Sequence, residues 1–528
     1  MSSNEKFILA IDHGTSGAKT AIVSVHGEVI DWVFKEYPLY LFENAGAEQN
    51  PDEWWNAIMD TSKKLLDKEL VPIENIVGIS NTSQWSGTVP LDKDGQHLMN
   101  ALIWMDGRGA KTLQNKLNKG FPKIEGYVLS RVIKFLWNCN GGPSRSGKDT
   151  LAHIMWLKDV HPEIYEKTYK FLEPQDWVNL KFTGKFASSF TTIQMHWITN
   201  IRDINNVHYS KSMLKMFKFD QDKFPKLFNT IDVLGPVKPE ISDELGLNKD
   251  TKVILGAPDV HSCVIGGGAI DYFQGALSIG TSDFLLCHVP WKKISIAHNM
   301  ASFPSPIPGK WLLMNEQEFA GGNLTFLRDN ILYHKDELLR EEKVEEVYQI
   351  FDKIVEKVDP GSNNVLFTPW IYGERAPVAD YTVRGGLHNV SLDTTREHVI
   401  RAIFEGVAFN VRWLHMYIEE LTKHKIDGII TLGGGAKSAI WCQIFSDILQ
   451  RTIKQVRNPR QANACGAAFM ASVGLGYIQW EDIPKYVKFS GVFKPNKENK
   501  AIYDKLFKEY VNIYNVSKKI CKRLNLKE

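Results

Sequence analysis

Two short segments of the sequence combine glycine, hydroxyl and charged side chains in a way that suits a phosphate group. In residues 8–23 an apolar stretch runs into the turn Asp-His-Gly-Thr-Ser-Gly and then into a second apolar stretch. Glycines let backbone N–H groups come close to an anion, and hydroxyls add further donors. Asp12 ends the first stretch, and its carboxylate can hold the water shell of a metal ion. The predicted phosphate-binding residues of this turn are Gly14, Thr15, Ser16 and Lys19.

A single turn of this kind is more often an ordinary β-turn, because glycine and aspartate are common in all turns. The same design recurs in residues 275–287, where Gly280, Thr281 and Ser282 stand between two apolar stretches. Internal repetition indicates a duplicated architecture. We therefore expect two turns, one in each half of the chain, that hold one polyphosphate from opposite sides through groups including Gly280 and Thr281.

Polar groups also follow two predicted strands, at positions where α/β sheets present ligand-binding groups. Residues 76–80 form a short apolar stretch that leads into a polar, glycine-bearing segment, and residues 101–104 precede an aspartate and an arginine. A carboxylate and a guanidinium can accept from and donate to the neighbouring hydroxyls of a polyol. The alternative for the charged pair is a surface salt bridge. The candidate polyol-binding pair is Asp106 and Arg108, and the polar segment after the first strand, residues 81–87, contains Gln84, Trp85 and Ser86.

Two more strand ends carry candidate groups. Asp259 follows an apolar stretch and precedes the glycine run 266–268, which would place it at a cleft, although a lone aspartate is more often a helix cap. Gly434, Gly435 and Ala436 open the predicted helix 440–449, where glycines allow a flat ring or a phosphate to lie against the backbone. Residues 142–149 nearly spell a P-loop, but Asp149 stands where serine or threonine is required, so we expect only a loop before a helix.

The elements that must position these groups can be read from caps and periodicity. Asn50 and Pro51 supply an N-cap and a favourable first residue for a helix through residue 66. Apolar spacing predicts a long helix over 397–422, and small residues predict a closely packed helix over 462–472. Residues 364–372 are predicted to form a strand before the pair Glu374 and Arg375, which we interpret as structural.

The composition is that of a large globular protein. A chain of 528 residues is too long to fold around a single hydrophobic core. Its 43% hydrophobic content, 23% charged content and net charge of +2 indicate no nucleic-acid partner. Six scattered cysteines favour neither disulfides nor a zinc site and fit a cytoplasmic location. The start of the chain does not resemble a signal peptide, and there is no apolar run of about 18 residues that would predict a membrane span. Nothing in the pattern specifies the oligomeric state, and a homodimer stays open.

These motifs, in this order, resemble those of the FGGY carbohydrate kinases over about residues 6–480. The resemblance implies an α/β fold with two actin-like, ribonuclease H-like domains around a central catalytic cleft that closes over sugar and Mg-ATP. The expected domains are residues 1–268, with the sugar site and first phosphate turn, and residues 269–528, with the second phosphate turn and the adenosine site. Within the family, residues 104–108 and 182–188 most resemble the branch that acts on xylulose.

The activity implied is transfer of the γ-phosphoryl group of ATP to a terminal hydroxyl of a ketopentose, with D-xylulose favoured. Ribulose, glycerol or a hexulose are alternative acceptors. The resemblance implies that Asp259 is the general base and that Asp12 anchors the magnesium ion. It also implies that Gly434, Gly435 and Ala436 face the adenosine. The segment 84–86 is expected to hold the sugar together with Asp106, Arg108 and Asp259.

Two departures from the family pattern affect these expectations. Trp85 and Ser86 stand where the xylulose branch usually has methionine and histidine, which leaves the particular sugar open, and the loop 126–147 is longer than usual. The same superfamily also contains chaperone and filament ATPases that need no sugar, and a catalytically inert sugar sensor is a third class. Asp106, Arg108 and Asp259 argue against an ATPase without a sugar site, and the retained base and phosphate turns argue against an inert sensor.

Overall fold

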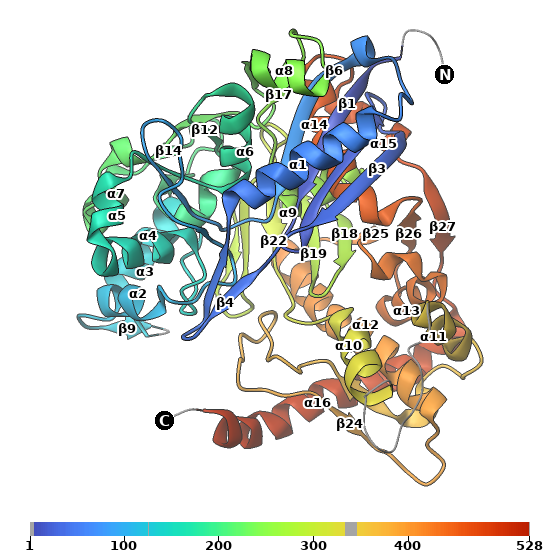
Figure 1. Ribbon diagram of the computed structural model, residues 1–528. Coiled ribbons are helices and arrows are strands. Elements are labelled where there is room, and N and C mark those ends of the chain that lie inside the picture. Colours follow the sequence, from blue (N-terminus) through green and yellow to red (C-terminus); the bar gives the residue numbers. More distant parts are fainter. Residues whose placement is uncertain (1–4, 125, 333–345, 527–528) are drawn as a thin grey trace, which may run out of the picture.

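The computed structural model describes residues 5–124, 126–332 and 346–526, and its two main β-sheets have the same core topology (Figure 1). In the first sheet, β1 is antiparallel to β2 and parallel to β6, which is parallel to β17. In the second sheet, β18 is likewise antiparallel to β19 and parallel to β25, which is parallel to β26. An antiparallel strand follows at the far edge of each sheet, β16 in the first and β27 in the second. The predicted duplication is therefore present in the strand order.

The strand bounds show how the two sheets are laid out along the chain. The first sheet has the order β16 (Val233–Pro236), β17 (Lys252–Ile254), β6 (Ile76–Ser83), β1 (Phe7–His13), β2 (Gly17–Ser24) and β3 (Val29–Glu36). The second has the order β20 (Ile294–Ser295), β21 (Met300–Pro304), β22 (Trp311–Met314), β19 (Asp283–Val289), β18 (Gln274–Ile279), β25 (Asp427–Leu432), β26 (Ile453–Val456) and β27 (Phe489–Phe493).

Several of the principal helices, among them α1, α12, α13 and α14, agree closely with the caps and periodicity of the sequence. Asn50 caps the helix that begins at Pro51, since its side chain accepts from the Asp52 N–H at 2.9 Å. The helices that cover the sheets are α1 (Pro51–Leu66), α6 (Pro174–Thr183), α9 (Asp259–Gly266), α12 (Arg396–Thr422), α13 (Ala439–Leu449), α14 (Ala462–Gly474) and α16 (Lys500–Asn525). A separate group of elements between β6 and β17 lies to one side of the first sheet (Figure 1) and contains α2 (Ala110–Leu117), α3 (Leu129–Cys139), α4 (Thr150–Val160), α5 (Pro162–Lys167) and α7 (Lys211–Phe217).

Strand β1 is buried on both faces because helices cover both sides of the first sheet. Phe7, Leu9 and Ile11 share one apolar cluster with residues of α1 and α6. Ile8 and Ala10 belong to a second cluster with the alanines of α14. Since neighbouring residues of a strand point to opposite faces, two-sided burial requires the continuous apolar run seen in the sequence.

Helix α14 lies in the second half of the sequence but packs on the first sheet and against α9. The two helices touch at glycines: a Cβ on Gly466 would lie 1.8 Å from the Ser262 carbonyl oxygen, and a Cβ on Gly266 would lie 1.9 Å from that of Ala462. Only glycine allows backbones to approach this closely. The small residues predicted for close packing in this helix therefore bring the two halves of the chain together.

The prediction of a strand over residues 364–372 is wrong in its length. Strand β23 covers only Leu366–Thr368 and pairs with β24 (Gly386–His388). Pro369 follows immediately, and proline has no N–H to continue a ladder. Trp370 beyond it is fully buried and donates to Asn410 Oδ1 at 3.1 Å, so the apolar pattern reflects core packing there.

Candidate active site

Most of the predicted site residues lie at the carboxyl-terminal edges of the two main sheets. Strands β1, β6 and β17 are parallel, so the turn after His13, the segment after Ser83 and the approach to Asp259 leave the first sheet at the same edge. In the second sheet β18 and β25 are parallel, which puts the turn after Ile279 beside the glycines after Leu432. Open α/β sheets bind ligands at such edges.

The first predicted phosphate turn is bonded directly to the predicted sugar segment. The Thr15 hydroxyl donates to Gln84 Oε1 at 3.1 Å and accepts from Trp104 Nε1 at 2.9 Å. Gln49 completes the connection, because its Nε2 donates to the Thr15 carbonyl at 2.7 Å and its Oε1 accepts from Gln84 Nε2 at 2.8 Å. Ser16, next in the turn, is exposed. The Thr15 hydroxyl thus makes both of its hydrogen bonds within the protein, whereas Ser16 is exposed to solvent.

The turn is shaped by its own backbone and by a tyrosine. The Gly14 N–H donates to the Gly17 carbonyl at 3.0 Å, and the Tyr37 hydroxyl donates to the Gly14 carbonyl. A Cβ on Gly17 would lie 2.4 Å from the Lys35 carbonyl oxygen of the neighbouring strand β3, so glycine is required there. Gln49 and Tyr37 carried no signal in the sequence, because a buried glutamine and a tyrosine at a strand end have no characteristic spacing.

Asp12 and Lys19 form an ion pair at the start of this turn. Lys19 Nζ lies 3.1 Å from Asp12 Oδ2 and donates to the Arg460 carbonyl at 2.9 Å. Asn463 Nδ2, near the start of α14, donates to Asp12 Oδ1 at 3.3 Å. The second half of the chain therefore contacts the first phosphate turn, through two residues that sequence reasoning missed.

Asp259 is the first residue of α9, and its surroundings raise the pKa of its carboxyl group. Its Oδ1 accepts from the Val260 N–H at 2.8 Å. Burial raises the pKa of Asp259 to about 7, and the negative charges of Asp12 and Glu316 act in the same direction. A carboxyl group with a pKa near neutrality is suited to accept a proton at physiological pH. The helix-cap alternative does not describe it, since Pro258 occupies the N-cap position.

The segment 84–86 after β6 is anchored by its three side chains and by the backbone of Gln84. The Gln84 N–H donates to the His13 carbonyl at 2.9 Å. Trp85 Nε1 donates to the Thr192 carbonyl at 2.7 Å, and its ring meets that of His261 edge to face at 5.2 Å. Ser86 has a φ of 68° and donates from Oγ to the Lys148 carbonyl at 3.1 Å. The tripeptide is held rigidly, and its contact with a sugar stays a prediction.

Asp106 and Arg108 form a salt bridge, as the alternative holds, but Asp106 is buried and the pair belongs to a wider network. Asp106 is 0% exposed, and its carboxylate accepts from the Ala47 N–H at 2.8 Å and from the Arg108 N–H at 3.0 Å. Arg108 pairs with Asp106 and Glu48, and its guanidinium lies 4.4 Å from the centroid of the Trp156 ring. Asp106 is thus occupied by donors of the protein, and the role of the pair in sugar binding stays a prediction.

The second phosphate turn and the glycine segment lie against each other. The Gly280 N–H donates to the Ser282 carbonyl at 2.9 Å, and Thr281 accepts from the Ala320 N–H at 2.7 Å. Gly433 has a φ of 82°, and a Cβ there would lie 2.6 Å from the Ile279 carbonyl oxygen. A Cβ on Gly434 would meet no atom of the described chain within 4 Å, which leaves its face open. Gly435 packs on Ile279, and Ala436 is buried.

A charged cluster next to the second turn was not identified as part of the site from sequence. Arg375 forms ion pairs with Glu316 and Glu318, which follow β22. Glu374 is buried and accepts from the N–H groups of Glu318 at 3.0 Å and Arg375 at 2.8 Å, and burial raises its pKa to about 7. The structural interpretation of Glu374 and Arg375 agrees with these contacts. Glu316 connects the cluster to the base, because its charge contributes to the raised pKa of Asp259.

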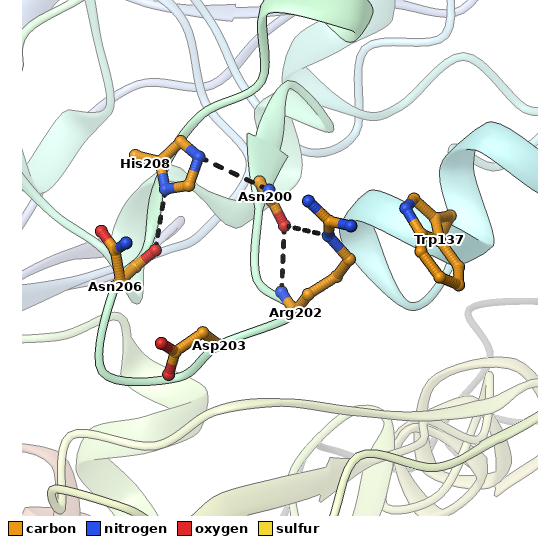
Figure 2. Close-up of a pocket in the computed structure, with 6 residues that line it drawn as sticks. All are labelled: Trp137, Asn200, Arg202, Asp203, Asn206 and His208. Atoms are coloured by element: carbon orange, nitrogen blue, oxygen red, sulfur yellow. Dashed lines mark hydrogen bonds between the residues drawn. The ribbon is translucent and has the colours of Figure 1, made fainter.

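A cavity of about 370 Å³ lies apart from these residues, in the group of elements beside the first sheet. Figure 2 shows its lining, in which Arg202 is held by Asn200 and its guanidinium lies 5.2 Å from the ring centroid of Trp137 on α3. Helix α3 lies within the loop 126–147, and Trp137 on it lines this cavity.

The family is established by comparison with known proteins. The N-terminal domain of the FGGY family of carbohydrate kinases matches residues 7–266, and the C-terminal domain of that family matches residues 275–475. The chain therefore belongs to the FGGY family of carbohydrate kinases, a class of enzymes that use ATP. The expected fold class and the expectation of a sugar kinase are confirmed.

Relatives of this chain match it over nearly their whole length. It is 29% identical over 522 residues to the xylulose kinase of Bacillus subtilis strain 168, with 97% of each chain covered. Among solved structures, a ligand-bound xylulose kinase from Lactobacillus acidophilus is 26% identical with a TM-score of 0.84, covering 97% of this chain and 98% of that one. A gluconate kinase from Lactobacillus acidophilus gives the same identity, TM-score and coverage. No helix in the described part of the chain has the length and apolar character needed to cross a membrane.

Proposed function

We propose that this carbohydrate kinase transfers the γ-phosphoryl group of ATP to a terminal hydroxyl of a ketopentose, with D-xylulose as the favoured acceptor. The observation that carries the proposal is Asp259, whose pKa is raised to about 7 at the edge of the sheet where the first phosphate turn and the segment 84–86 also end. Xylulose kinases matched over nearly their full length support the choice of acceptor.

In this mechanism Asp259 accepts the proton of the attacking hydroxyl. Phosphoryl transfer spreads negative charge over the phosphoryl oxygens and mainly requires alignment and neutralisation. The exposed hydroxyl of Ser16 would supply one hydrogen-bond donor, whereas the N–H groups of Gly14 and Gly280 already donate within their own turns. Lys19 would add a positive charge. The predicted phosphate-binding set is Gly14, Thr15, Ser16, Lys19, Gly280 and Thr281.

The two substrates would be bound at different sheets. Gln84, Trp85 and Ser86, with Arg108 oriented by Asp106, would bind the sugar at the first sheet. Gly434 would accommodate the adenosine at the second sheet, because its open face allows a flat ring to approach the backbone. The domains 1–268 and 269–528 would close over both, with the close contact of α9 and α14 as the fixed point between them.

Asp12 fits the role of magnesium anchor in its chemistry. The described residues contain no group of three or more histidine, cysteine, aspartate or glutamate side chains that could hold a metal ion. Mg²⁺ in nucleotide sites commonly uses one or two carboxylates and otherwise phosphates and water, so one carboxylate beside a phosphate turn is sufficient. When bound, the ion would neutralise negative charge on the phosphates.

The alternative acceptors remain ribulose, glycerol or a hexulose, and the similarity to a gluconate kinase adds an aldonate. Ser86 in place of the usual histidine leaves more than one acceptor sterically reasonable. A sugar-independent ATPase is disfavoured by the set of Asp106, Arg108 and Asp259, and an inert sugar sensor is disfavoured by the retained base and phosphate turns. The free state of all six cysteines and the use of ATP are consistent with a cytoplasmic location.

A coupled ADP-release assay with a panel of ketoses and polyols tests the proposal. We expect D-xylulose to be phosphorylated with the highest kcat/KM of the panel. ADP release without any acceptor would instead indicate an ATPase. An inert D-xylulose alongside rapid turnover of ribulose, glycerol or a hexulose would overturn the assignment of the acceptor while leaving the kinase class in place.

A further inference from the structure

Asn140, at the carboxyl end of α3, joins the two halves of the chain through its side chain. It lies among the residues that match the N-terminal family domain. Its Nδ2 nevertheless donates to the carbonyls of Lys293 and Ser302, each at 2.8 Å, in the part that matches the C-terminal domain. Asn140 is 3% exposed, so the contact is buried. One amide group therefore makes two buried hydrogen bonds across the boundary between the halves.

The donor is fixed within the first half. The Asn138 carbonyl accepts from the Ile201 N–H at 2.8 Å, and Cys139 Sγ donates to the Thr199 carbonyl at 3.2 Å. Asn140 has a φ of 56°, a left-handed conformation that asparagine tolerates and that ends helix α3. The end of α3 is thus expected to move with the first half.

The two acceptor carbonyls are fixed within the second half. The Ser302 N–H, on β21, donates to the Lys293 carbonyl at 2.9 Å, and the Lys293 N–H donates to Ser302 Oγ at 2.7 Å. Lys293 Nζ also donates to the Leu421 carbonyl near the end of α12 at 3.0 Å. The side chain of Asn140 therefore connects α3 to a well-bonded part of the second half.

An aromatic contact between the halves lies beside this amide. Trp197, in the first half, and Phe303 on β21 meet edge to face with their ring centroids 5.8 Å apart, and each is 5% exposed. A Cβ on Gly141 would lie 3.1 Å from the Trp197 ring and 3.6 Å from that of Phe303. Trp197 follows the short helix Thr192–His196, whose first carbonyl accepts from Trp85. The contact between the halves is therefore linked to the proposed acceptor segment.

The halves also meet where α9 packs against α14, and that contact is of a different kind. The two helices touch at Gly266 and Gly466, and apolar residues of both helices share one core cluster. They cannot separate without exposing this apolar surface. By contrast, the hydrogen bonds of Asn140 come from a single side chain and can break without a change in the backbone. With two contacts between the halves, a rotation about the helix pair requires the Asn140 contact to open.

We propose that the side chain of Asn140 and its two acceptor carbonyls form a latch that limits the opening of the halves before substrates bind, with the α9–α14 contact as the pivot. Loss of two buried hydrogen bonds should shift the equilibrium toward the open state by about 10- to 100-fold. Substrates that require the closed state would then bind more weakly by up to the same factor, because they must also bring about closure. This inference goes beyond the proposed function, since it concerns the protein without ligands.

The test variant is Asn140→Gly. Glycine readily adopts a positive φ and commonly ends helices, so α3 should keep its end while both hydrogen bonds are lost. The matched control is Asn299→Gly, because Asn299 also has a positive φ, 51°, but is exposed in the turn between β20 and β21. A second variant, Asn140→Asp, keeps the size of the side chain and places carboxylate oxygens against the two carbonyls.

Small-angle scattering without ligands should give a larger radius of gyration for both Asn140 variants than for the wild-type protein and Asn299→Gly. Saturating ATP, with the acceptor of highest kcat/KM, should bring all four proteins to the same radius. KM for that acceptor should rise in Asn140→Gly by up to about 100-fold. The kcat should change little, because the closed complex is the same once it has formed.

The inference is overturned if the ligand-free radius of Asn140→Gly equals that of the wild-type protein, even when Tm falls, since Asn140 would then contribute to stability alone. An enlarged radius with loss of helix in circular dichroism would also reject it, because α3 would have unfolded. The ligand-free measurement is independent of the proposed function. A protein that does not phosphorylate D-xylulose but opens on loss of the Asn140 side chain would reject the acceptor and support the latch.

Discussion

The hydroxyl of Thr15 donates to Gln84 Oε1 across 3.1 Å, so one hydrogen bond joins the proposed phosphate turn to the proposed sugar segment. The same hydroxyl accepts from Trp104 Nε1, two residues before Asp106. The two predicted binding functions of the first sheet are therefore coupled through a single side chain.

Thr15→Val should weaken the binding of both substrates. It leaves the Trp104 indole N–H and the Gln84 oxygen without their partner, and each unsatisfied buried group costs about 1–3 kcal/mol. We expect KM to rise for sugar and for ATP, and Thr15→Ser to restore both. A rise confined to ATP would show that Thr15 acts only on the phosphates.

Asp259→Asn should lower kcat by about 10²- to 10⁴-fold, the usual contribution of a general base. Asparagine keeps the size of the side chain and can still accept from the Val260 N–H. We therefore expect nucleotide affinity, measured by calorimetry, to change little. Turnover at the wild-type rate would exclude Asp259 as the base.

The raised pKa of Asp259 also predicts a pH dependence. A base must be deprotonated, so kcat/KM should fall as the pH drops below about 7, by tenfold per pH unit once the carboxyl is mostly protonated. The same raised pKa disfavours the ionised form in the folded state. Its destabilising effect is absent below the unfolded pKa, near 3.8, and complete above about 7.

Stability measurements test this electrostatic account independently of activity. Asp259→Asn should raise Tm relative to the wild-type protein more at pH 8 than at pH 5, because the wild-type carboxylate is fully charged only at the higher pH. An equal difference in Tm at both pH values would indicate that the carboxyl group titrates normally.

Sugar and ATP together should compact the protein more than either alone. The two phosphate turns belong to different sheets, and a ligand shifts such an equilibrium only through contacts that differ between open and closed states. Small-angle scattering should show the smallest radius of gyration with both substrates at saturation. An unchanged radius would contradict closure of the two halves.

Two glycine substitutions should have opposite consequences. Gly466→Ala should lower Tm strongly, because its Cβ would lie 1.8 Å from the Ser262 carbonyl oxygen of α9. Gly434→Ala should leave Tm nearly unchanged, since the Cβ meets no described atom within 4 Å, but should raise KM for ATP. A Gly434→Ala protein with normal ATP affinity would place the adenosine elsewhere.

Local rules in the sequence determined several of the elements and their bounds. The Asn50 cap and Pro51 fixed the start of α1, and the Gly-Thr-Ser turns were visible because tight turns need particular residues at particular positions. The long apolar helix over 397–422 was predicted to within one residue at its start. These features depend on interactions within a few residues, which a single sequence displays directly. The prediction of a strand over 364–372 was wrong in its length because the β-ladder ends before Pro369, while the apolar Trp370 beyond it is buried in the core.

The tertiary structure alone decided which distant groups meet at the site. Asn463 reaches Asp12, Gln49 bridges Thr15 and Gln84, and Glu316 acts on both Asp259 and Lys148. None of these residues has a spacing or a motif that indicates a partner tens to hundreds of residues away. Their contacts arise because parallel strands end at a common edge and because α14 crosses to the first sheet. The raised pKa of Asp259 has the same origin, since Asp259 becomes buried and the charges of Asp12 and Glu316 come close to it only once the chain has folded.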